Sequence, residues 1–447
     1  MKIYDLIDKK IVILGFGKEG RALFEFLKNI GASQIDVVDE KAVEANKTDG
    51  DCVINEPFEN VDLNCYDVVL RSPGVSYARV EALLGDKNKI SSAVDLMLST
   101  ANCVTIGVTG TKGKSTTVKI IQRMLELSEK KVVLGGNIGL VPLEQIESLS
   151  EEDFLLLELS SFQLDGLKVS PDIAVVLPIG SDHLDYHANL GEYIEAKSAI
   201  CAFQQAGDKL IYYQDAIGAK LSEKSKAKKI TYSEQQLQAN CFKKNDGVCC
   251  SVENMPEKQY LGLEKYSTEY KIPFINLICA FGFAYAMNLD FDIAQLFEGF
   301  EKLPFRIELA RQVGGVEFFN DSASTNPIST IEAIKTISKP FVLIAGGSSK
   351  SLSYNQMGED LARNVNVKAV FLYGNTAQEI KSALDQAHFN SDVQMVGDLQ
   401  EAVNKSFVFA KEKLIEVVLF SPGSASFDNF QNYQERGRMF NEIVKGL

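Results

Sequence analysis

The sequence predicts an α/β protein with three consecutive domains, in which mostly parallel sheets are covered by helices. Three observations support this prediction. Wholly apolar stretches of strand length alternate with stretches of helical periodicity. This alternation restarts twice, and the length of 447 residues agrees with about three domains. We expect an N-terminal Rossmann-like domain at 1–98, a central P-loop-type ATPase domain with a mostly parallel sheet at 99–302, and a C-terminal Rossmann-like domain at 303–447.

The first domain begins with a glycine motif between a strand and a helix. Strands are expected at 10–16, 34–39 and 66–74, and a helix at 21–31. The string GFGKEG (15–20) is a complete G-x-G-x-x-G, and Asp39 ends the second strand. In dinucleotide-binding turns the glycines let the backbone approach a diphosphate, and the acid binds a ribose. Taken alone, this motif indicates an NAD-type cofactor; the alternative is a helix start with a charged surface.

The other two domains continue the same alternation. The central domain is expected to have strands at 102–110, 131–137, 153–160 and 173–179, and helices at 115–130 and 275–289. Its region 206–270 is polar and weakly patterned, which favours an antiparallel excursion. The third domain is expected to have strands at 340–347, 367–374, 393–398 and 416–423, and a last helix at about 427–445.

The string GVTGTKGKSTT (107–117) follows an apolar strand and opens a helix, as a phosphate-binding loop does. In such loops backbone N–H groups face the anion. Lys114 is then the lysine that reaches the outer phosphates, and Ser115 the hydroxyl that binds Mg²⁺. The usual G-x-x-x-x-G-K-[ST] pattern is not matched, because Val108 stands five residues before Gly113. The alternative is an ordinary glycine-rich turn.

Candidate metal ligands follow two apolar strands of the central domain. Glu158 ends the stretch LLLE, where a carboxylate is costly unless it meets a cation such as Mg²⁺. Two of the three histidines, His183 and His187, stand in DHLDYH after another strand. We expect His183 to serve the metal and His187 to lie in a surface turn. Lys197, judged by its neighbours alone, is a solvated helix lysine.

Composition and charge narrow the classes of partner. Lys and Arg number 46 against 60 Asp and Glu, a net charge of −14, which disfavours nucleic acid and anionic membrane surfaces. No apolar run is long enough for a membrane span, and the N-terminus is not a signal peptide. The eight cysteines are too sparse for a disulfide scaffold. We therefore expect a cytoplasmic protein.

The motifs together resemble the Mur ligase family and, more distantly, its folylpolyglutamate synthetase relatives. The loop at 107–117 is similar to the ATP loop of these enzymes, and DHLDYH followed by YIEAK is similar to their metal and lysine segment. Four further segments resemble the branch of the family that adds D-glutamate: GNIGL (136–140), ELSSFQL (158–164), NDSASTNP (320–327) and SPGSASFDNFQNYQERGRMF (421–440). The resemblance covers all three domains in the family's order.

The resemblance implies an ATP-dependent amide ligase of peptidoglycan precursor synthesis, and hence of cell-wall biogenesis, cell shape and cell division. Its substrates would be UDP-N-acetylmuramoyl-L-alanine, D-glutamate and ATP, with an acyl-phosphate intermediate. Its cofactors would be Mg²⁺ and a carbamylated Lys197, a modification that turns a cation into an oxygen ligand. The first domain would bind UDP and the third the amino acid. A monomer is implied as well.

The site residues that this resemblance implies fall into five sets. The catalytic residues would be Lys114, His183 and Lys197. The metal would be bound by Ser115, Glu158, His183 and Lys197. ATP would be bound by Gly110, Thr111, Lys112, Gly113, Lys114, Ser115, Thr116, Asn276, Arg306 and Asp321. The UDP-sugar would be bound by Lys18, Glu19, Asp39, Ser72, Gly74, Asn137, Ser160 and Gln163. D-glutamate would be bound by Thr325, Lys350, Ser426, Phe427 and Tyr433.

Three departures from the family's pattern keep alternatives open. Lys112 stands in place of an asparagine, Phe305 in place of a common histidine, and Ala323 in place of a lysine. Ala323 removes a cation from the substrate cleft, so a ligase of different amino-acid specificity is one alternative. A nucleotide-binding homologue without ligase activity is another. An NAD-dependent oxidoreductase would leave the loop at 107–117 unexplained.

Overall fold

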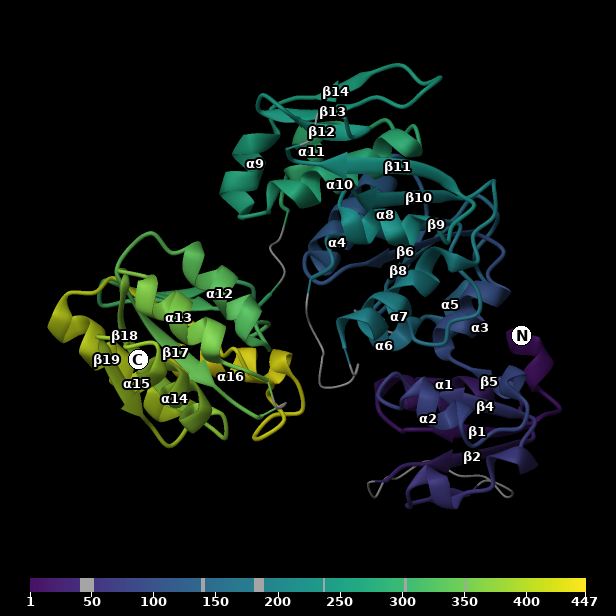
Figure 1. Cartoon of the computed structure of the whole chain (residues 1–447), viewed down its shortest axis with the longest axis horizontal. Helices are drawn as coiled ribbons and strands as arrows, with labels where there is room; N and C mark the ends of the chain where they lie inside the picture. The colour runs from purple at the N-terminus through teal and green to yellow at the C-terminus, as the bar shows by residue number, and fades with distance from the viewer. Residues whose placement is uncertain (41–51, 138–140, 181–188, 236–237, 301–303, 350–351) are drawn as a thin grey trace. The chain divides into compact units, whose positions relative to one another are not determined.

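The computed structural model describes the 447-residue chain except residues 41–51, 138–140, 181–188, 236–237, 301–303 and 350–351. The chain forms two compact units, Met1–Phe300 and Glu301–Leu447. The first unit contains two sheets and the second contains one (Figure 1). The prediction of a three-domain α/β fold with mostly parallel sheets is confirmed. The boundary at 98/99 stays a prediction because it lies inside the first unit, and the one at 302/303 falls outside the described residues.

The first sheet is entirely parallel and has the order β3-β2-β1-β4-β5. Its strands are β1 (Lys10–Leu14), β2 (Gln34–Val38), β3 (Val53–Ile54), β4 (Val68–Arg71) and β5 (Ile90–Ser91). The helices are α1 (Lys18–Asn29), α2 (Tyr77–Glu81) and α3 (Ala93–Thr100). The strand order reverses at β1, because the chain passes to β2 on one side and later to β4 on the other. Ligands of open α/β sheets bind at such a switch point.

The second sheet has nine strands in the order β14-β13-β12-β11-β10-β9-β6-β8-β7. They are β6 (Val104–Thr109), β7 (Val132–Gly136), β8 (Phe154–Glu158), β9 (Ile173–Val176), β10 (Lys209–Tyr213), β11 (Lys228–Ser233), β12 (Cys241–Lys244), β13 (Gly247–Cys250) and β14 (Lys258–Tyr260). The predicted antiparallel excursion is found only for β12, β13 and β14. The strands β10 and β11 continue the parallel sheet instead, which corrects that expectation.

Helices cover both faces of this second sheet. They are α4 (Lys114–Leu127), α5 (Leu143–Ile146), α6 (Ser161–Leu164), α7 (Leu190–Ala202), α8 (Ala216–Ser222), α9 (Leu263–Tyr270), α10 (Phe274–Ala286) and α11 (Ile293–Phe297). Successive residues of β8 enter two different cores, Leu155 and Leu157 one of them, Phe154 and Leu156 the other. This double burial explains why the strand is apolar throughout. Among the described helices, none is long and apolar enough to cross a membrane.

The third sheet, in the second unit, has the order β15-β16-β20-β17-β18-β19. Its strands are β15 (Glu308–Val313), β16 (Val316–Asn320), β17 (Phe341–Gly346), β18 (Val367–Tyr373), β19 (Asp392–Met395) and β20 (Val417–Phe420). Its helices are α12 (Pro327–Lys335), α13 (Asn355–Arg363), α14 (Ala377–Gln386), α15 (Leu399–Lys413) and α16 (Tyr433–Lys445). The final helix starts at Tyr433 and not near residue 427, because the Asn432 side chain accepts a hydrogen bond from the Glu435 N–H and caps it there.

Candidate active site

The loop between β6 and α4 has the backbone of a phosphate-binding loop. Gly110 and Gly113 both have positive φ angles, of 150° and 82°. A Cβ atom on Gly113 would lie 2.2 Å from the side-chain nitrogen of Asn276. The loop ends at the N-terminus of α4, a helix of 14 residues, where N–H groups and the helix dipole favour an anion. The local sequence therefore builds a concave, amide-lined turn.

The predicted ATP-binding residues of the first unit lie together around this loop. The Lys114 Nζ donates to the carbonyl oxygens of Gly110 at 3.0 Å and of Thr111 at 3.1 Å. The Asn276 side chain donates to the Gly113 carbonyl oxygen at 2.9 Å and to the Thr117 hydroxyl at 3.1 Å. Lys112, Ser115 and Thr116 occupy the same turn and the start of α4. The two hydrogen bonds of Asn276 attach the loop to α10 and fix its shape.

Glu158 is a buried carboxylate at the end of β8, and it is 1% exposed. The Asn137 side chain donates to its Oε1 at 2.8 Å. Its Oε2 has no hydrogen-bond partner among the described residues. A buried carboxylate oxygen without a partner is costly, and a cation is one partner that removes the cost. Glu158 therefore has the chemistry of a ligand for a hard cation such as Mg²⁺.

Lys197 is fully enclosed beneath the phosphate loop, with 1% of its surface exposed. Its Nζ donates to the Thr109 hydroxyl and to the Gly110 carbonyl oxygen, both at 3.1 Å. It also lies 4.8 Å from the centre of the Tyr193 ring. The expectation of a solvated lysine, drawn from its neighbours alone, was wrong. Lys197 shares the buried face of α7 with Tyr193, Ala196 and Ile200, and this i, i+3, i+4, i+7 spacing was a readable signal.

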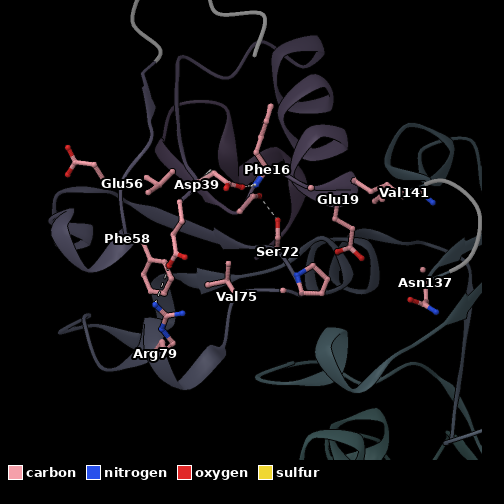
Figure 2. Close-up of a pocket in the computed structure, with 18 residues that line it drawn as sticks. Phe16, Glu19, Asp39, Glu56, Phe58, Ser72, Val75, Arg79, Asn137 and Val141 are labelled. Carbon is pink, nitrogen blue, oxygen red and sulfur yellow. Dashed lines mark hydrogen bonds and ion pairs between the residues drawn. The ribbon is translucent and has the colours of Figure 1, made fainter. Parts of the chain in front are cut away.

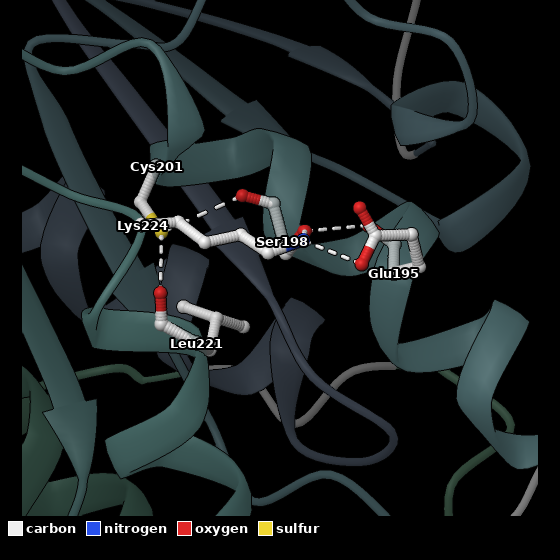
Figure 3. A network of polar contacts seen from close by, with 5 residues as sticks. All are labelled: Glu195, Ser198, Cys201, Leu221 and Lys224. Atoms are coloured by element: carbon white, nitrogen blue, oxygen red, sulfur yellow. Dashed lines mark hydrogen bonds and ion pairs between the residues drawn. The ribbon is translucent and has the colours of Figure 1, made fainter.

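Polar contacts of Glu195, Ser198 and Cys201 fasten α7 to the region that follows it in the chain (Figure 3). The Lys224 ammonium lies between the Glu195 carboxylate and the Ser198 hydroxyl, and it donates to the latter at 2.9 Å. The Cys201 thiol donates to the carbonyl oxygens of Ser198 and Leu221. These contacts join α7 to α8 and to the turn that follows it. They hold the helix at the position that brings Lys197 under the loop.

The chemistry of these groups fits a magnesium ion. Ser115 and Glu158 offer oxygen ligands, and a carbamylated Lys197 would add two more. His183 lies outside the described residues. In the described part of the chain, no three His, Cys, Asp or Glu side chains form a metal-binding group by themselves. A site here would therefore depend on the serine, on the modified lysine and on the ATP phosphates.

A pocket of about 720 Å³ lies at the switch point of the first sheet (Figure 2). Its floor is the glycine turn, where the Phe16 N–H donates to the Asp39 carboxylate at 2.7 Å and the Ser72 hydroxyl to the Gly15 carbonyl oxygen at 2.6 Å. Phe58 and Arg79 stand at one end and Asn137 at the other. The predicted UDP-sugar residues that line it are Lys18, Glu19, Asp39, Ser72, Gly74 and Asn137.

The remaining two residues of that set, Ser160 and Gln163, lie in a tight hydrogen-bonded turn next to Glu19. The Ser160 side chain accepts a hydrogen bond from the Gln163 N–H, and the Gln163 side chain accepts one from the Ser160 N–H, which caps α6. The Gln163 amide also donates to the Glu19 carboxylate. Burial raises the pKa of Glu19, while this hydrogen bond and the charges of Arg71 and Lys18 oppose the rise. The residues predicted to bind the UDP-sugar therefore come from the domains of the first two sheets, and the hydrogen bond between Gln163 and Glu19 joins them.

In the second unit, Asp321 lies just after β16 and is 4% exposed. Its Oδ2 accepts hydrogen bonds from the hydroxyls of Ser324 at 2.6 Å and Ser421 at 2.7 Å. Burial raises the pKa of Asp321 to about 6, and the two serines and the exposed Arg306 oppose this rise. Phe305, which stands where the family pattern has histidine, is buried against Gly437 and has a φ angle of 64°.

The described residues predicted to bind the amino acid lie in the loops after β16 and β20 and at the start of α16. Thr325 follows β16, and Ser426 and Phe427 follow β20. Ser426 is buried and Phe427 is 69% exposed, with its N–H donating to the Ser348 hydroxyl. Tyr433 starts α16, and its carbonyl oxygen accepts from Ser322. Lys350 lies outside the described residues.

Two buried arginines were missed by sequence reasoning. Arg436 is 0% exposed and donates to Ser322, Ser424 and Ala425, so it joins the loops after β16 and β20. Arg71 is 2% exposed and joins β4 to the turn around α6. The signal for Arg71 was its place directly after the apolar run VVL, and that for Arg436 its place in a helix with apolar neighbours at i+4 and i+7.

Comparisons with known proteins agree with this geometry. Residues 108–264 match the family model described as the Mur ligase middle domain. The chain is 32% identical to the UDP-N-acetylmuramoylalanine--D-glutamate ligase of Caldicellulosiruptor bescii, with 99% of each chain covered. It is also 32% identical to that of Clostridioides difficile, covering 99% of this chain and 100% of the relative.

Solved structures share the fold at lower identity. MurF from Acinetobacter baumannii superposes with a TM-score of 0.59 at 16% identity, covering 99% of this chain and 93% of that one. The MurF ligase of Thermotoga maritima, solved in complex with ADP, has a TM-score of 0.58 at 16% identity, with 99% and 96% covered. At these identities the structural likeness concerns the fold alone.

Proposed function

The chain belongs to the Mur ligase family, in the group of UDP-N-acetylmuramoylalanine--D-glutamate ligases, and on this premise we propose that it joins D-glutamate to UDP-N-acetylmuramoyl-L-alanine with ATP. One observation carries the proposal above the others. Similarity to ligases of this name extends over 99% of the chain, through all three sheets. The loop between β6 and α4 supports the use of ATP, since it has the glycines, the lysine and the helix start that phosphates need.

The reaction proceeds in two displacements. A carboxylate oxygen of the alanyl group attacks the γ-phosphorus of ATP, which forms an acyl phosphate and releases ADP. The amino nitrogen of D-glutamate then attacks the acyl carbon, the tetrahedral intermediate loses phosphate, and the nitrogen loses a proton. The loop amides and the Lys114 ammonium stabilise the charge on the transferred group. No protein nucleophile takes part in these steps.

The residues around the loop would also hold the metal. Ser115, Glu158, His183 and a carbamylated Lys197 are the proposed ligands. A bound Mg²⁺ would neutralise charge on the phosphates of ATP. The unpaired Glu158 oxygen and the enclosed Lys197 amine support this assignment. Gly110, Thr111, Lys112, Gly113, Thr116 and Asn276 would contact the nucleotide, together with Arg306 and Asp321 of the second unit.

The pocket at the first switch point is the proposed site of the UDP moiety. Its size, about 720 Å³, suits a nucleotide, and the glycine turn at its floor suits a diphosphate. Lys18 would pair with a phosphate, and Asp39 with a ribose. Asn137, at the far end of the pocket, would hydrogen-bond the muramoyl-alanine part, with Ser160 and Gln163 beside it.

The second unit would bind the amino acid through Thr325, Lys350, Ser426, Phe427 and Tyr433. A dicarboxylate needs a cation and several donors, and Lys350 would supply the charge. Ala323 lacks the cation that the family pattern has nearby, so the other members of this set must suffice for D-glutamate. We also propose that the enzyme is a cytoplasmic monomer whose product enters peptidoglycan precursor synthesis.

Phosphate release from ATP and Mg²⁺ tests the proposal. The reaction contains UDP-N-acetylmuramoyl-L-alanine and one amino acid at a time, D-glutamate first. Release that requires both D-glutamate and the nucleotide sugar supports the ligase. Release with a different amino acid alone keeps the chemistry and changes the specificity. If ATP binds and no phosphate is released under any condition, the chain is a homologue that has lost ligase activity. The departures at Lys112, Phe305 and Ala323 are the reason to test this alternative.

A further inference from the structure

Arg71 is a buried cation at the junction between the first two sheets. It is the last residue of β4, directly before the Ser72-Pro73-Gly74 turn of the UDP pocket, and it is 2% exposed. Its Nη1 donates to the Val75 carbonyl oxygen at 2.6 Å, which fastens that turn. Its Nη2 donates to the carbonyl oxygens of Phe162 at 3.1 Å and Asp165 at 2.5 Å. One guanidinium therefore holds a pocket turn and a segment 91 to 94 residues later.

The segment that it holds is Ser160–Lys168, which contains α6. A helix of four residues has no intrahelical partner for its last carbonyl groups, so other donors must satisfy them. Two of the three carbonyl oxygens that Arg71 contacts are in this segment. The Lys168 N–H donates to the buried Asp95 carboxylate at 2.9 Å, and its ammonium donates to Lys87 and Ile90. Besides packing against α7, the segment is therefore hydrogen-bonded to residues of the first sheet's domain.

The planar shape of a guanidinium is what this junction uses. Nη1 donates to a carbonyl group of the Val75 turn, and Nη2 donates to two carbonyl groups around α6. A lysine has one nitrogen and cannot hold both sides with the same geometry. Glu19 lies close enough for its carboxylate to feel the Arg71 charge, and the same carboxylate accepts from Gln163. Arg71 and Glu19 therefore both hold the short turn that contains α6, Arg71 through backbone carbonyl groups and Glu19 through the Gln163 side chain.

We propose that Arg71 is a positioning residue for the nucleotide sugar: it fixes Ser160 and Gln163 relative to the UDP pocket. The inference rests on the proposed function, in which these two residues meet the muramoyl-alanine end of the substrate. The UDP end lies against a turn that is also closed without Arg71, by the Ser72 hydroxyl on the Gly15 carbonyl oxygen and by the Val75 N–H on the Ser72 carbonyl oxygen. Loss of Arg71 should therefore weaken the binding of UDP-N-acetylmuramoyl-L-alanine more than the binding of UDP.

The test compares two ligands on one folded enzyme. Calorimetry gives the Kd of UDP and of UDP-N-acetylmuramoyl-L-alanine for the wild type, Arg71→Met and Arg71→Lys. We expect Arg71→Met to change the Kd of UDP less than about twofold and to weaken the nucleotide sugar at least about tenfold. The KM for the nucleotide sugar rises likewise, while the KM for ATP changes less than about twofold. Arg71→Lys keeps the charge and loses the planar guanidinium, so its Kd for the nucleotide sugar should lie between those of the wild type and Arg71→Met.

Arg123→Met is the matched control. Arg123 also donates to backbone carbonyl groups, those of Gln295 and Glu298, in the same unit but away from both ligands. Its loss should leave the ratio of the two Kd values unchanged. If Arg71→Met fails to fold, as judged by circular dichroism, Arg71→Lys decides the question alone.

Three outcomes overturn the inference. They are an equal loss of affinity for both ligands, no loss in a folded variant, and a wild type that binds the nucleotide sugar no better than UDP. The proposed function fails separately. A wild type that binds the nucleotide sugar more tightly than UDP, yet releases no phosphate with any amino acid, contradicts the ligase and leaves the role of Arg71 testable by the same binding ratio.

Discussion

Asn276 and Gly113, 163 residues apart, are locked together by a 2.9 Å hydrogen bond from the side-chain amide to the carbonyl oxygen. The bond joins the apolar helix α10 to the turn that begins α4. Because Gly113 has a φ angle of 82°, its carbonyl group can point to α10 while the following amides face the loop interior. The proposed ATP site therefore depends on a residue with no side chain and on a partner far along the chain.

Gly113→Ala should abolish high-affinity ATP binding. A Cβ atom there would lie 2.2 Å from the Asn276 side chain, in a backbone conformation that L side chains rarely adopt. We expect the Kd of ATP, measured by calorimetry, to rise at least about tenfold, which corresponds to about 1.4 kcal/mol. Gly207→Ala is the control, because nothing lies within 4 Å of its Cβ position. Unchanged affinity in a folded Gly113→Ala variant would contradict the assignment of this loop.

Glu158→Gln should weaken Mg²⁺ binding without lowering the stability of the fold. The substitution keeps the shape and removes a buried charge whose Oε2 lacks a partner among the described residues. We expect the Mg²⁺ concentration for half-maximal activity to rise about 10- to 100-fold, because an oxygen ligand is weakened. Without Mg²⁺, thermal unfolding of the variant should occur at the wild-type temperature or above it, since a buried charge is costly. A lowered unfolding temperature together with normal Mg²⁺ dependence would mean that Glu158 is structural.

Lys197 should react with CO₂. Its Nζ is enclosed, and the carbamate N–COO⁻ forms when the neutral amine attacks the carbon and a proton leaves. In ¹³C-bicarbonate we expect a carbamate resonance in the NMR spectrum of the wild type and none in Lys197→Gln. The variant should also lose at least about tenfold in kcat, since a proposed metal ligand is missing. Lys220→Gln, at an exposed position of α8, is the control and should keep the resonance. A wild-type spectrum without it would remove the carbamate from the proposed metal shell.

Most of the fold could be predicted because each central strand is buried on two faces and is apolar throughout. The hairpin of β15 and β16 was missed although Gly314-Gly315 is a hairpin-turn signal, because β15 carries charged residues and is largely exposed. In the candidate site, Glu158 stood out as a carboxylate ending an apolar strand. The contacts of Arg71 could not be foreseen, because its acceptors are backbone carbonyl groups of a segment about 90 residues away. Every residue type has a backbone carbonyl group, so the sequence does not show which ones accept a hydrogen bond from Arg71.

Asp321 should make the stability of the second unit fall as pH rises. Burial raises the pKa of its carboxyl to about 6 from an ordinary 3.8, so between these values the folded chain holds a proton that the unfolded chain has lost. The contribution is therefore full below pH 3.8 and is lost as pH rises through 6, a difference of about 3 kcal/mol. Hydrogen exchange of β16 and β20 peptides should show Asp321→Asn gaining protection over the wild type between pH 4 and pH 7. Asp392→Asn, an exposed position, should show no such trend.

Arg436 should be the most stability-sensitive arginine of the second unit. It is 0% exposed, and its guanidinium donates four hydrogen bonds to Ser322, Ser424 and Ala425. Arg436→Met leaves three carbonyl oxygens and a hydroxyl without this donor in the interior, which costs about 1 to 3 kcal/mol for each acceptor that stays unpaired. We expect hydrogen exchange in the loops after β16 and β20 to accelerate by at least about 100-fold.

Arg438→Met tests whether this effect belongs to position 436 or to any arginine of α16. Arg438 lies two residues further on the same helix and is exposed, so its loss should change stability by less than about 0.5 kcal/mol. Thr325, Ser426 and Phe427, three of the residues proposed to bind D-glutamate, lie in the two loops that Arg436 joins. In Arg436→Lys we therefore expect a raised KM for D-glutamate with an unchanged Kd for UDP. Equal exchange rates in the Arg436→Met and Arg438→Met variants would show that the buried guanidinium does not hold these loops.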